Sequence, residues 1–328
     1  MIRLSFLVTF ILFFSAKAFA VTDLKVSNDN CEYKKPAVVY FATHAIAHPF
    51  WTVVENGAME GARDACITLK WTEDVNFSVQ TTIERMEIAL TENPDVLVIT
   101  ATDPAAMRDT LERAKEKGIP VIAINVNDTA PALERVPYMI YIGGSEYDGG
   151  VAAANRILSE GNVNRALCTN GYPGHVGLEA RCRGYKETME AAGIEVDVIS
   201  TEGGATDAEG AISAYFLKNP NTNAWFATSP GPVGWEAADV YLQSSGKAGQ
   251  IHLITFDLTS EILDSIKRGD TLGAVDQQPY LQGYLASILA RNYVDWGLMP
   301  YEQILTGPAI VDAMNAEKVI AGAAEKRR

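Results

Sequence analysis

The feature that most constrains the fold is a series of short, continuous apolar runs separated by amphipathic stretches. The runs are rich in valine and isoleucine and cover residues 37–43, 95–102, 120–126, 139–144, 166–171, 196–201, 224–229 and 251–257. Segments with helical periodicity, such as 107–118 (MRDTLERAKEKG), lie between them. Continuous hydrophobicity is typical of strands buried on both faces, and helices between such strands make a sheet parallel. The pattern therefore predicts an α/β fold.

The chain has 328 residues, which is enough for two domains with a core each. Residues 48–71 and 176–199 share one order of features, namely a loop, a helix with a glycine in mid-course, a short turn and a strand. Two similar α/β halves that meet near Gly143 and Gly144 would explain this echo. A chance similarity between two ordinary βαβ units would explain it as well.

The N-terminus predicts secretion. Residues 1–20 hold an early cation, Arg3, then an apolar stretch at 4–14 and the small-x-small pattern AFA at 18–20. The alternative is a membrane anchor, but the apolar stretch is shorter than the ~20 residues of a spanning helix. We therefore expect a signal peptide cut after Ala20 and a product in the periplasm. The formal net charge of −14 disfavours nucleic acid as a partner.

The four cysteines permit three pairings, and the periplasm permits disulfides. Cys31 precedes the first predicted strand and Cys66 ends the helix that follows it, so both should lie at one end of that layer. Cys168 and Cys182 flank a loop from a strand to a helix. Placement therefore favours the pairs Cys31 with Cys66 and Cys168 with Cys182.

Ligands of parallel open sheets bind beyond the carboxyl ends of the strands. These positions carry no convincing catalytic set, since the chain has no G-x-G dinucleotide fingerprint, P-loop or G-x-S-x-G elbow. His44, His48 and His175 fall in strand-end loops, and a spacing of four between the first two suits zinc on a helix. Pro49 argues against a helix through His48. We expect no metal, no cofactor and no enzymatic activity.

The remaining strand-end side chains offer hydrogen-bond donors and acceptors without an activated nucleophile. They are Asn125, Asn127, Asn170, Arg181, Asp257 and Gln277, with the aromatic residues Phe50 and Trp51 nearby. Carboxylates, amides and a guanidinium bind hydroxyl groups, and aromatic faces meet the C–H faces of a sugar ring. The combination favours binding of a neutral polyhydroxylated molecule.

Several stretches together resemble the periplasmic sugar-binding proteins of ABC transporters, in the ribose- and galactose-binding class. They are HPFW followed by NGAMEGA, GIPVIAIN (118–125), ARCRGY (180–185), ITFDLTSEILDSIKRGD (254–270) and AVDQQPYLQGY (274–284). The resemblance covers about residues 36–318. It implies two Rossmann-like lobes, with parallel sheets flanked by helices, that are joined by a three-stranded hinge and close on a ligand.

Carried onto this chain, the first lobe would be 36–144 plus 277–305, and the second 145–276 plus 306–328. The resemblance implies a monomer that delivers a monosaccharide, polyol, cyclitol or similar small ligand to an ABC permease in the inner membrane. A sensory role, in which the loaded protein docks on a sensor kinase or a chemotaxis receptor, is the alternative.

The family's ligand-binding residues correspond to named positions here. The N-P-F-F motif appears as His48, Pro49, Phe50 and Trp51, whose first residue would bond hydroxyls and whose aromatics would sandwich the ring. The other matches are the arginine of R-x-x-G-[FY] at Arg181, the aspartate at Asp257, the hinge glutamine at Gln277, and Ser229 where ribose binders carry asparagine. For Phe50 and Trp51 the alternative is a hydrophobic staple that faces the core, and for Asp257 it is a helix cap.

Departures from the ribose pattern leave the ligand open. This chain has Asn125-Val126 where ribose binders carry Asp-Arg, which removes a charge pair. The loop before residue 48 is about one residue longer, so either Thr43 or His44 could face the ligand. A polyol, a cyclitol, a deoxysugar or a furanose fits as well as ribose or galactose.

Overall fold

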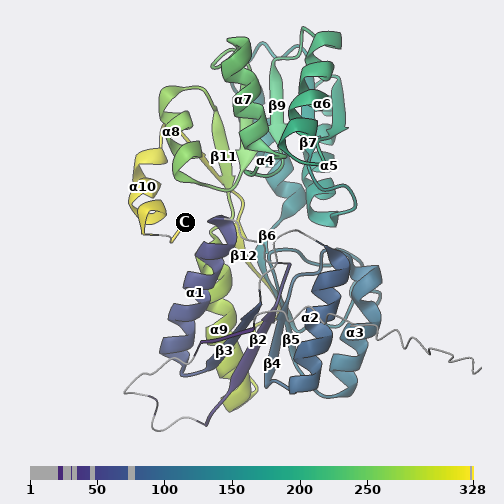
Figure 1. Ribbon diagram of the computed structural model, residues 1–328, viewed down its shortest axis with the longest axis vertical. Coiled ribbons are helices and arrows are strands. Elements are labelled where there is room, and N and C mark those ends of the chain that lie inside the picture. The colour runs from purple at the N-terminus through teal and green to yellow at the C-terminus, as the bar shows by residue number, and fades with distance from the viewer. Residues whose placement is uncertain (1–20, 25–30, 32–34, 45–48, 73–77, 326) are drawn as a thin grey trace, which may run out of the picture.

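Two sheets, each flanked by helices, build the molecule (Figure 1). The computed structural model describes residues 21–24, 31, 35–44, 49–72, 78–325 and 327–328. The predicted leader and His48 lie outside the described residues. The α/β class is confirmed, and the predicted apolar runs all contain strands.

The first sheet has the strand order β1-β3-β2-β4-β5-β6-β12. Its strands are β1 (Val21–Leu24), β2 (Val38–Ala42), β3 (Thr68–Thr72), β4 (Val96–Ile99), β5 (Val121–Ile124), β6 (Ile140–Gly144) and β12 (Glu302–Gly307). All neighbours are parallel except β1, which runs antiparallel to β3. The central strands β4, β5 and β6 are buried along their whole length, as expected for a parallel sheet that is covered on both faces.

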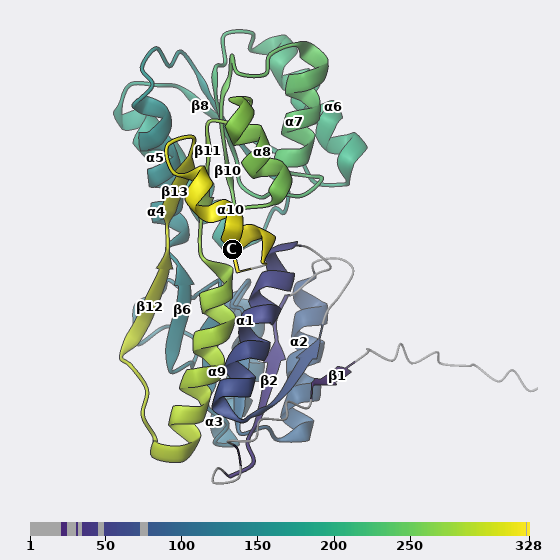
Figure 2. The ribbon, with the colours of Figure 1, turned by 90° about the vertical axis from the view of Figure 1, so that its left-hand side faces the viewer.

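Helices cover both faces of this sheet, and we call the unit the first lobe. On one face α1 (Pro49–Ala65) and α9 (Pro279–Trp296) lie side by side, and on the other lie α2 (Val79–Glu92) and α3 (Pro104–Glu116) (Figures 1 and 2). A Cβ atom on Gly57 of α1 would lie 2.0 Å from the backbone oxygen of Tyr280 of α9. Glycine is therefore required where the two helices approach each other.

The second sheet has the strand order β13-β11-β10-β9-β7-β8, with β13 antiparallel to β11. Its strands are β7 (Ala166–Asn170), β8 (Val196–Ser200), β9 (Ala224–Ala227), β10 (His252–Phe256), β11 (Gly273–Asp276) and β13 (Ala309–Asp312). The helices of this second lobe are α4 (Glu146–Leu158), α5 (Val176–Ala191), α6 (Ala205–Lys218), α7 (Trp235–Ser245), α8 (Ser260–Arg268) and α10 (Ala316–Ala324). α4 and α5 cover one face, and the other helices cover the opposite face.

The chain passes between the two sheets at three places. These crossings follow β6, follow β11 and separate β12 from β13, and Figure 2 shows β6 and β12 running side by side toward the second lobe. The carboxyl ends of the parallel strands of both sheets face the junction between the lobes. Side chains that follow these strands are therefore brought together there.

Candidate functional site

A cavity with a volume of about 90 Å³ lies between the lobes. One water molecule needs roughly 10–15 Å³ of such volume, so the cavity has room for several waters or one small ring. Seven of the eight predicted ligand-binding residues line it, namely Phe50, Trp51, Asn125, Arg181, Ser229, Asp257 and Gln277. The eighth, His48, lies outside the described residues. Of the other polar candidates, Asn127 lines a separate cavity, and Asn170 accepts a hydrogen bond from the backbone N–H of Tyr172 (2.9 Å).

Phe50 and Trp51 form the aromatic side of the cavity. They stand in the first turn of α1, which begins at Pro49, a residue well suited to the first position of a helix. Their rings pack edge to face with centroids 5.1 Å apart, and their exposed fractions are only 7% and 3%. Both also belong to the core of the first lobe. The two readings of this pair are therefore compatible, because each ring packs on the core and also lines the cavity.

His44, rather than Thr43, faces the cavity. Thr43 is fully buried, and its backbone oxygen accepts a hydrogen bond from Arg85 (2.9 Å). The Nδ1 atom of His44 lies 2.8 Å from the hydroxyl of Thr100, and its ring packs edge to face on Trp51 with centroids 4.8 Å apart. Of the two residues that the sequence left as alternatives, His44 is therefore the one that faces the cavity.

His175 lies opposite His44, on the second lobe. The ring centroids of the two histidines are 5.3 Å apart. His175 caps α5, because its Nδ1 accepts hydrogen bonds from the backbone N–H groups of Gly177 (3.2 Å) and Leu178 (3.4 Å). Since Nδ1 is an acceptor, the proton of the neutral ring is on Nε2. Beside it, the N–H of Val176 donates to the backbone oxygen of Thr102 across the lobe junction (3.4 Å).

A chain of hydrogen bonds joins both lobes through the hinge. The Asn125 amide donates to Oε1 of Gln277 (3.1 Å), and Nε2 of Gln277 donates to Oδ1 of Asp257 (2.7 Å). Asn125 and Asp257 have left-handed backbones, with φ of 61° and 68°, a conformation that Asn and Asp adopt more readily than most residues. Asp257 is therefore a strand-end side chain aimed at the cavity, and the cap of α8 is Thr259 instead.

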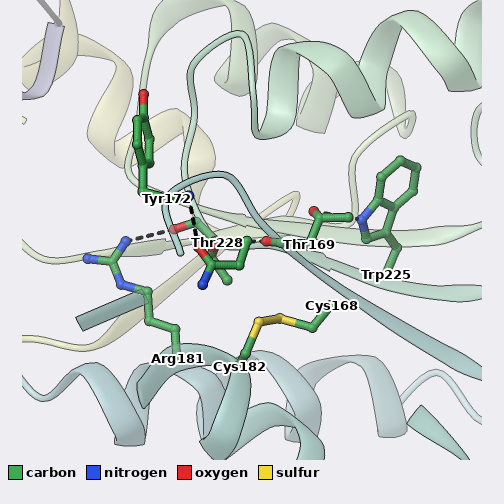
Figure 3. Close-up of a disulfide and its surroundings, with 8 residues drawn as sticks. Cys168, Thr169, Tyr172, Arg181, Cys182, Trp225 and Thr228 are labelled. Carbon is green, nitrogen blue, oxygen red and sulfur yellow. Dashed lines mark hydrogen bonds between the residues drawn. A yellow bond between two sulfur atoms is a disulfide. The ribbon is translucent and has the colours of Figure 1, made fainter. Parts of the chain in front are cut away.

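Arg181 is held rigidly at the opposite side of the cavity. Its Nε donates to the carboxylate of Glu146, its Nη1 donates to the backbone oxygen of Thr228 (2.7 Å), and its guanidinium lies 3.5 Å from the centroid of the Phe256 ring. Figure 3 shows Arg181 reaching from α5 toward Thr228, with Tyr172 on the same side. Thr228 in turn donates its hydroxyl to the backbone oxygen of Thr169 (2.8 Å).

Burial shifts the pKa values of the titratable groups at the cavity. Burial raises the pKa of Asp257 to about 7, although the charge of Arg181 and the hydrogen bond from Gln277 oppose the shift. Burial lowers the pKa of His175 to about 3, and the charge of Arg181 adds to the effect. Burial also lowers the pKa of His44 well below its ordinary value, helped by His175 and Arg181. Both rings are therefore neutral at pH 7.

The disulfide Cys168–Cys182 ties α5 to β7 beside the site (Figure 3). Cys182 immediately follows Arg181, and both half-cystines are buried. The second disulfide, Cys31–Cys66, lies in the first lobe. Both pairs are the ones favoured by placement in the sequence.

The predicted ligand-binding set left out several lining residues, namely Tyr172, His175, Leu178, Pro230 and Gly231, and it left His44 open as an alternative to Thr43. His44, Tyr172, Pro230 and Gly231 lie within a few residues of the ends of β2, β7 and β9, whereas His175 and Leu178 stand at the start of α5. The predicted set also left out Glu146, the partner of Arg181. No local signal identifies that residue.

The described part of the chain also bears on metal binding and on membrane insertion. No group of three or more histidine, cysteine, aspartate or glutamate side chains there is placed to hold a metal ion. No helix there is both long and apolar enough to cross a membrane.

The chain matches one family of known proteins. The model of the periplasmic binding protein domain matches residues 39–297. The chain is similar to a xylose/arabinose-binding protein of Sulfolobus acidocaldarius, with 26% identity over 293 residues that cover 85% of this chain and 72% of the relative. It is also similar to the ribose import binding protein of Bacillus subtilis, with 24% identity, covering 80% of this chain and 83% of the relative.

A solved structure agrees in both fold and sequence. A carbohydrate transporter from Acidothermus cellulolyticus, in complex with myo-inositol, superposes with a TM-score of 0.81 at 26% identity. The match covers 90% of this chain and 100% of that chain. The fold of this chain thus has a known counterpart over nearly its whole length. The chain belongs to the periplasmic binding protein family, with the type I fold of its sugar-binding members.

Proposed function

We propose that the protein is the solute-binding component of an ABC importer, and that it binds a monosaccharide, polyol or cyclitol in the cavity between the lobes. The cavity itself carries the proposal, because it sets two aromatic rings against a cluster of fixed hydrogen-bonding groups. This combination suits a ring with apolar C–H faces and a rim of hydroxyls. The names of the relatives, which bind xylose, arabinose or ribose, and the myo-inositol complex support the same class of ligand.

A thermal-shift screen with pentoses, hexoses, polyols and inositols tests the proposal. A ligand of the folded form raises the melting temperature by mass action. A hit should then lose about 10- to 100-fold in affinity in Asp257→Asn, since a hydrogen bond to a charged group is worth about 1.5–3 kcal/mol. Asp264→Asn is the matched control, because Asp264 is exposed on α8 and makes the same change of side chain away from the cavity. A hit whose affinity survives Asp257→Asn would refute this site.

We infer further that the leader of residues 1–20 exports the protein to the periplasm and that an inner-membrane permease receives the ligand. Membership of the family supports both steps. The mass of the exported protein should correspond to a chain that starts at Val21. Deletion of the gene should abolish uptake of the ligand, whereas unchanged uptake with a lost sensory response would favour the receptor role.

A further inference from the structure

Helices α4 and α5, which cover one face of the second sheet, cross at very short range. A Cβ atom on Gly150 of α4 would lie 2.0 Å from the backbone oxygen of Arg181, and one on Gly184 of α5 would lie 2.1 Å from that of Tyr147. Only glycine permits this approach. The crossing brings the first residue of α4, Glu146, directly against Arg181.

Glu146 and Arg181 form a buried ion pair. The side chain of each is 5% exposed, and Nε of Arg181 donates to Oε2 of Glu146. The other carboxylate oxygen, Oε1, is buried and has no hydrogen-bond partner among the described residues. Glu146 lines a separate cavity of about 290 Å³ next to the hinge and is not among the residues of the ligand cavity. It therefore balances the charge of Arg181 from outside the ligand cavity.

The charges at the ligand cavity are few. Among the described residues that line it, Arg181 is the one cation and Asp257 the one carboxylate, while His44 and His175 are neutral. With Arg181 offset by Glu146, the site has no net positive charge, and it becomes negative when Asp257 ionises. A ligand carboxylate would lose its hydration there without gaining an unpaired cation, which is unfavourable in a buried site.

We propose that Glu146 restricts the site to uncharged ligands, because it neutralises the charge of Arg181 from outside the ligand cavity. Glu146 is a positioning and specificity-determining residue that acts through Arg181 and does not touch the ligand. The inference rests on the proposed function, because it assigns a charge preference to the same cavity. It also gives a reason why Oε1 of Glu146 has no hydrogen-bond partner among the described residues, since the carboxylate is needed for its charge rather than for a second hydrogen bond.

The test is Glu146→Gln, which keeps an oxygen for Nε of Arg181 and replaces an oxygen that has no partner to lose. Calorimetry at pH 7.5 would compare D-galactose with D-galacturonate, D-xylose with D-xylonate, and glycerol with D-glycerate. The last pair is small enough to fit whatever the natural ligand is. The wild type should bind the neutral member of a pair at least tenfold more tightly. In Glu146→Gln the acid should gain at least tenfold relative to its neutral partner.

Two further variants keep the test decisive. Glu190→Gln removes one negative charge from the exposed face of α5 and should leave the acid-to-neutral ratio unchanged. Glu146→Met removes the charge with a side chain of similar length, so it should show the same gain and it replaces Glu146→Gln if that variant does not fold. Since removal of one partner of a buried ion pair destabilises a fold, circular dichroism first establishes that each variant at position 146 is folded.

The outcomes separate the two proposals. If no sugar, polyol or inositol binds the wild type, the proposed function fails whatever Glu146 does. If a neutral ligand binds but the acid binds the wild type equally well, the inference about Glu146 fails alone. It fails also if removal of the charge at 146 leaves the acid-to-neutral ratio unchanged.

Discussion

Asp257 is the residue whose protonation should respond most directly to a ligand. Its side chain is 8% exposed, and burial raises its pKa to about 7. In the unfolded chain a carboxyl of this kind has a pKa of about 3.9. With the lobes in this arrangement, the folded protein without a ligand therefore binds more protons between about pH 4 and 7 than the unfolded chain, and this group destabilises it increasingly as the pH rises through that range.

Ligand binding should release protons near pH 7. Hydroxyl groups that donate to Asp257 favour the ionised form and lower its pKa. Since about half of the ligand-free carboxyls are protonated at pH 7, up to about half a proton per ligand should leave. Calorimetry in buffers of different ionisation enthalpy measures this number. Asp257→Asn should release none, and uptake of protons by the wild type would contradict the prediction.

At the scale of elements, α5 gathers much of the second lobe's part of the site. His175 caps it, Arg181 stands in its second turn, and Cys182 bonds it to β7. The helix is thus fixed at both the strand below and the glycine crossing with α4. Its position should therefore matter for affinity as well as for stability.

Removal of the bond between β7 and α5 should weaken both properties. Cys168→Ala with Cys182→Ala opens a loop of sequence separation 14, and the free energy of unfolding should fall by about 3 kcal/mol. Urea denaturation measures that loss, and calorimetry should show weaker ligand binding. The matched control, Cys31→Ala with Cys66→Ala, should lower stability without a change in affinity, because Cys66 follows the end of α1 that lies away from the cavity residues Phe50 and Trp51. Equal affinity in all three proteins would refute a role of the bond in holding Arg181.

For the molecule as a whole, the lobes meet with His44 of one lobe against His175 of the other, an arrangement that we call the closed form. Arg181 also faces His175, and Arg181 and Arg85 both lower the pKa of His44. Protonation of His175 would also remove the acceptor that caps α5 and place a positive charge at a helix N-terminus, where it is unfavourable. Both histidines are therefore neutral in the closed form.

Affinity should fall as the pH drops toward 3. An open form removes the burial that is the main cause of the low pKa of His175, so it takes up a proton at a higher pH than the closed form, which resists protonation down to about 3. Asp257 also loses its charge in this range, so the comparison is best made in Asp257→Asn. In the Asp257→Asn protein, the second change His175→Asn keeps a side chain that can cap the helix. It should reduce the fall in affinity by up to about tenfold for each pH unit. An unchanged profile would contradict the prediction.

The fold follows from local patterns, and much of the site does too. Strands β4 to β6 and β9 are buried on both faces, which a single sequence displays as continuous apolar runs. Asn125, Arg181 and Asp257 follow from the rule that strand ends meet. The pairing of Glu146 with Arg181 does not, because it depends on how closely two helices cross, and that distance is set by tertiary packing at Gly150 and Gly184. Two further features depend on the backbone geometry of loops. They are the cap that His175 makes on α5, and the orientation that turns His44 rather than Thr43 toward the cavity.

Both disulfides together use all four cysteines of the chain. A cysteine introduced at Pro173, which is exposed beside Tyr172 at the cavity, would thus be the sole reactive thiol. A solvent-sensitive dye attached there would report the arrival of a ligand as a change in emission. The native architecture therefore lends itself to an optical sensor that needs no other reagent.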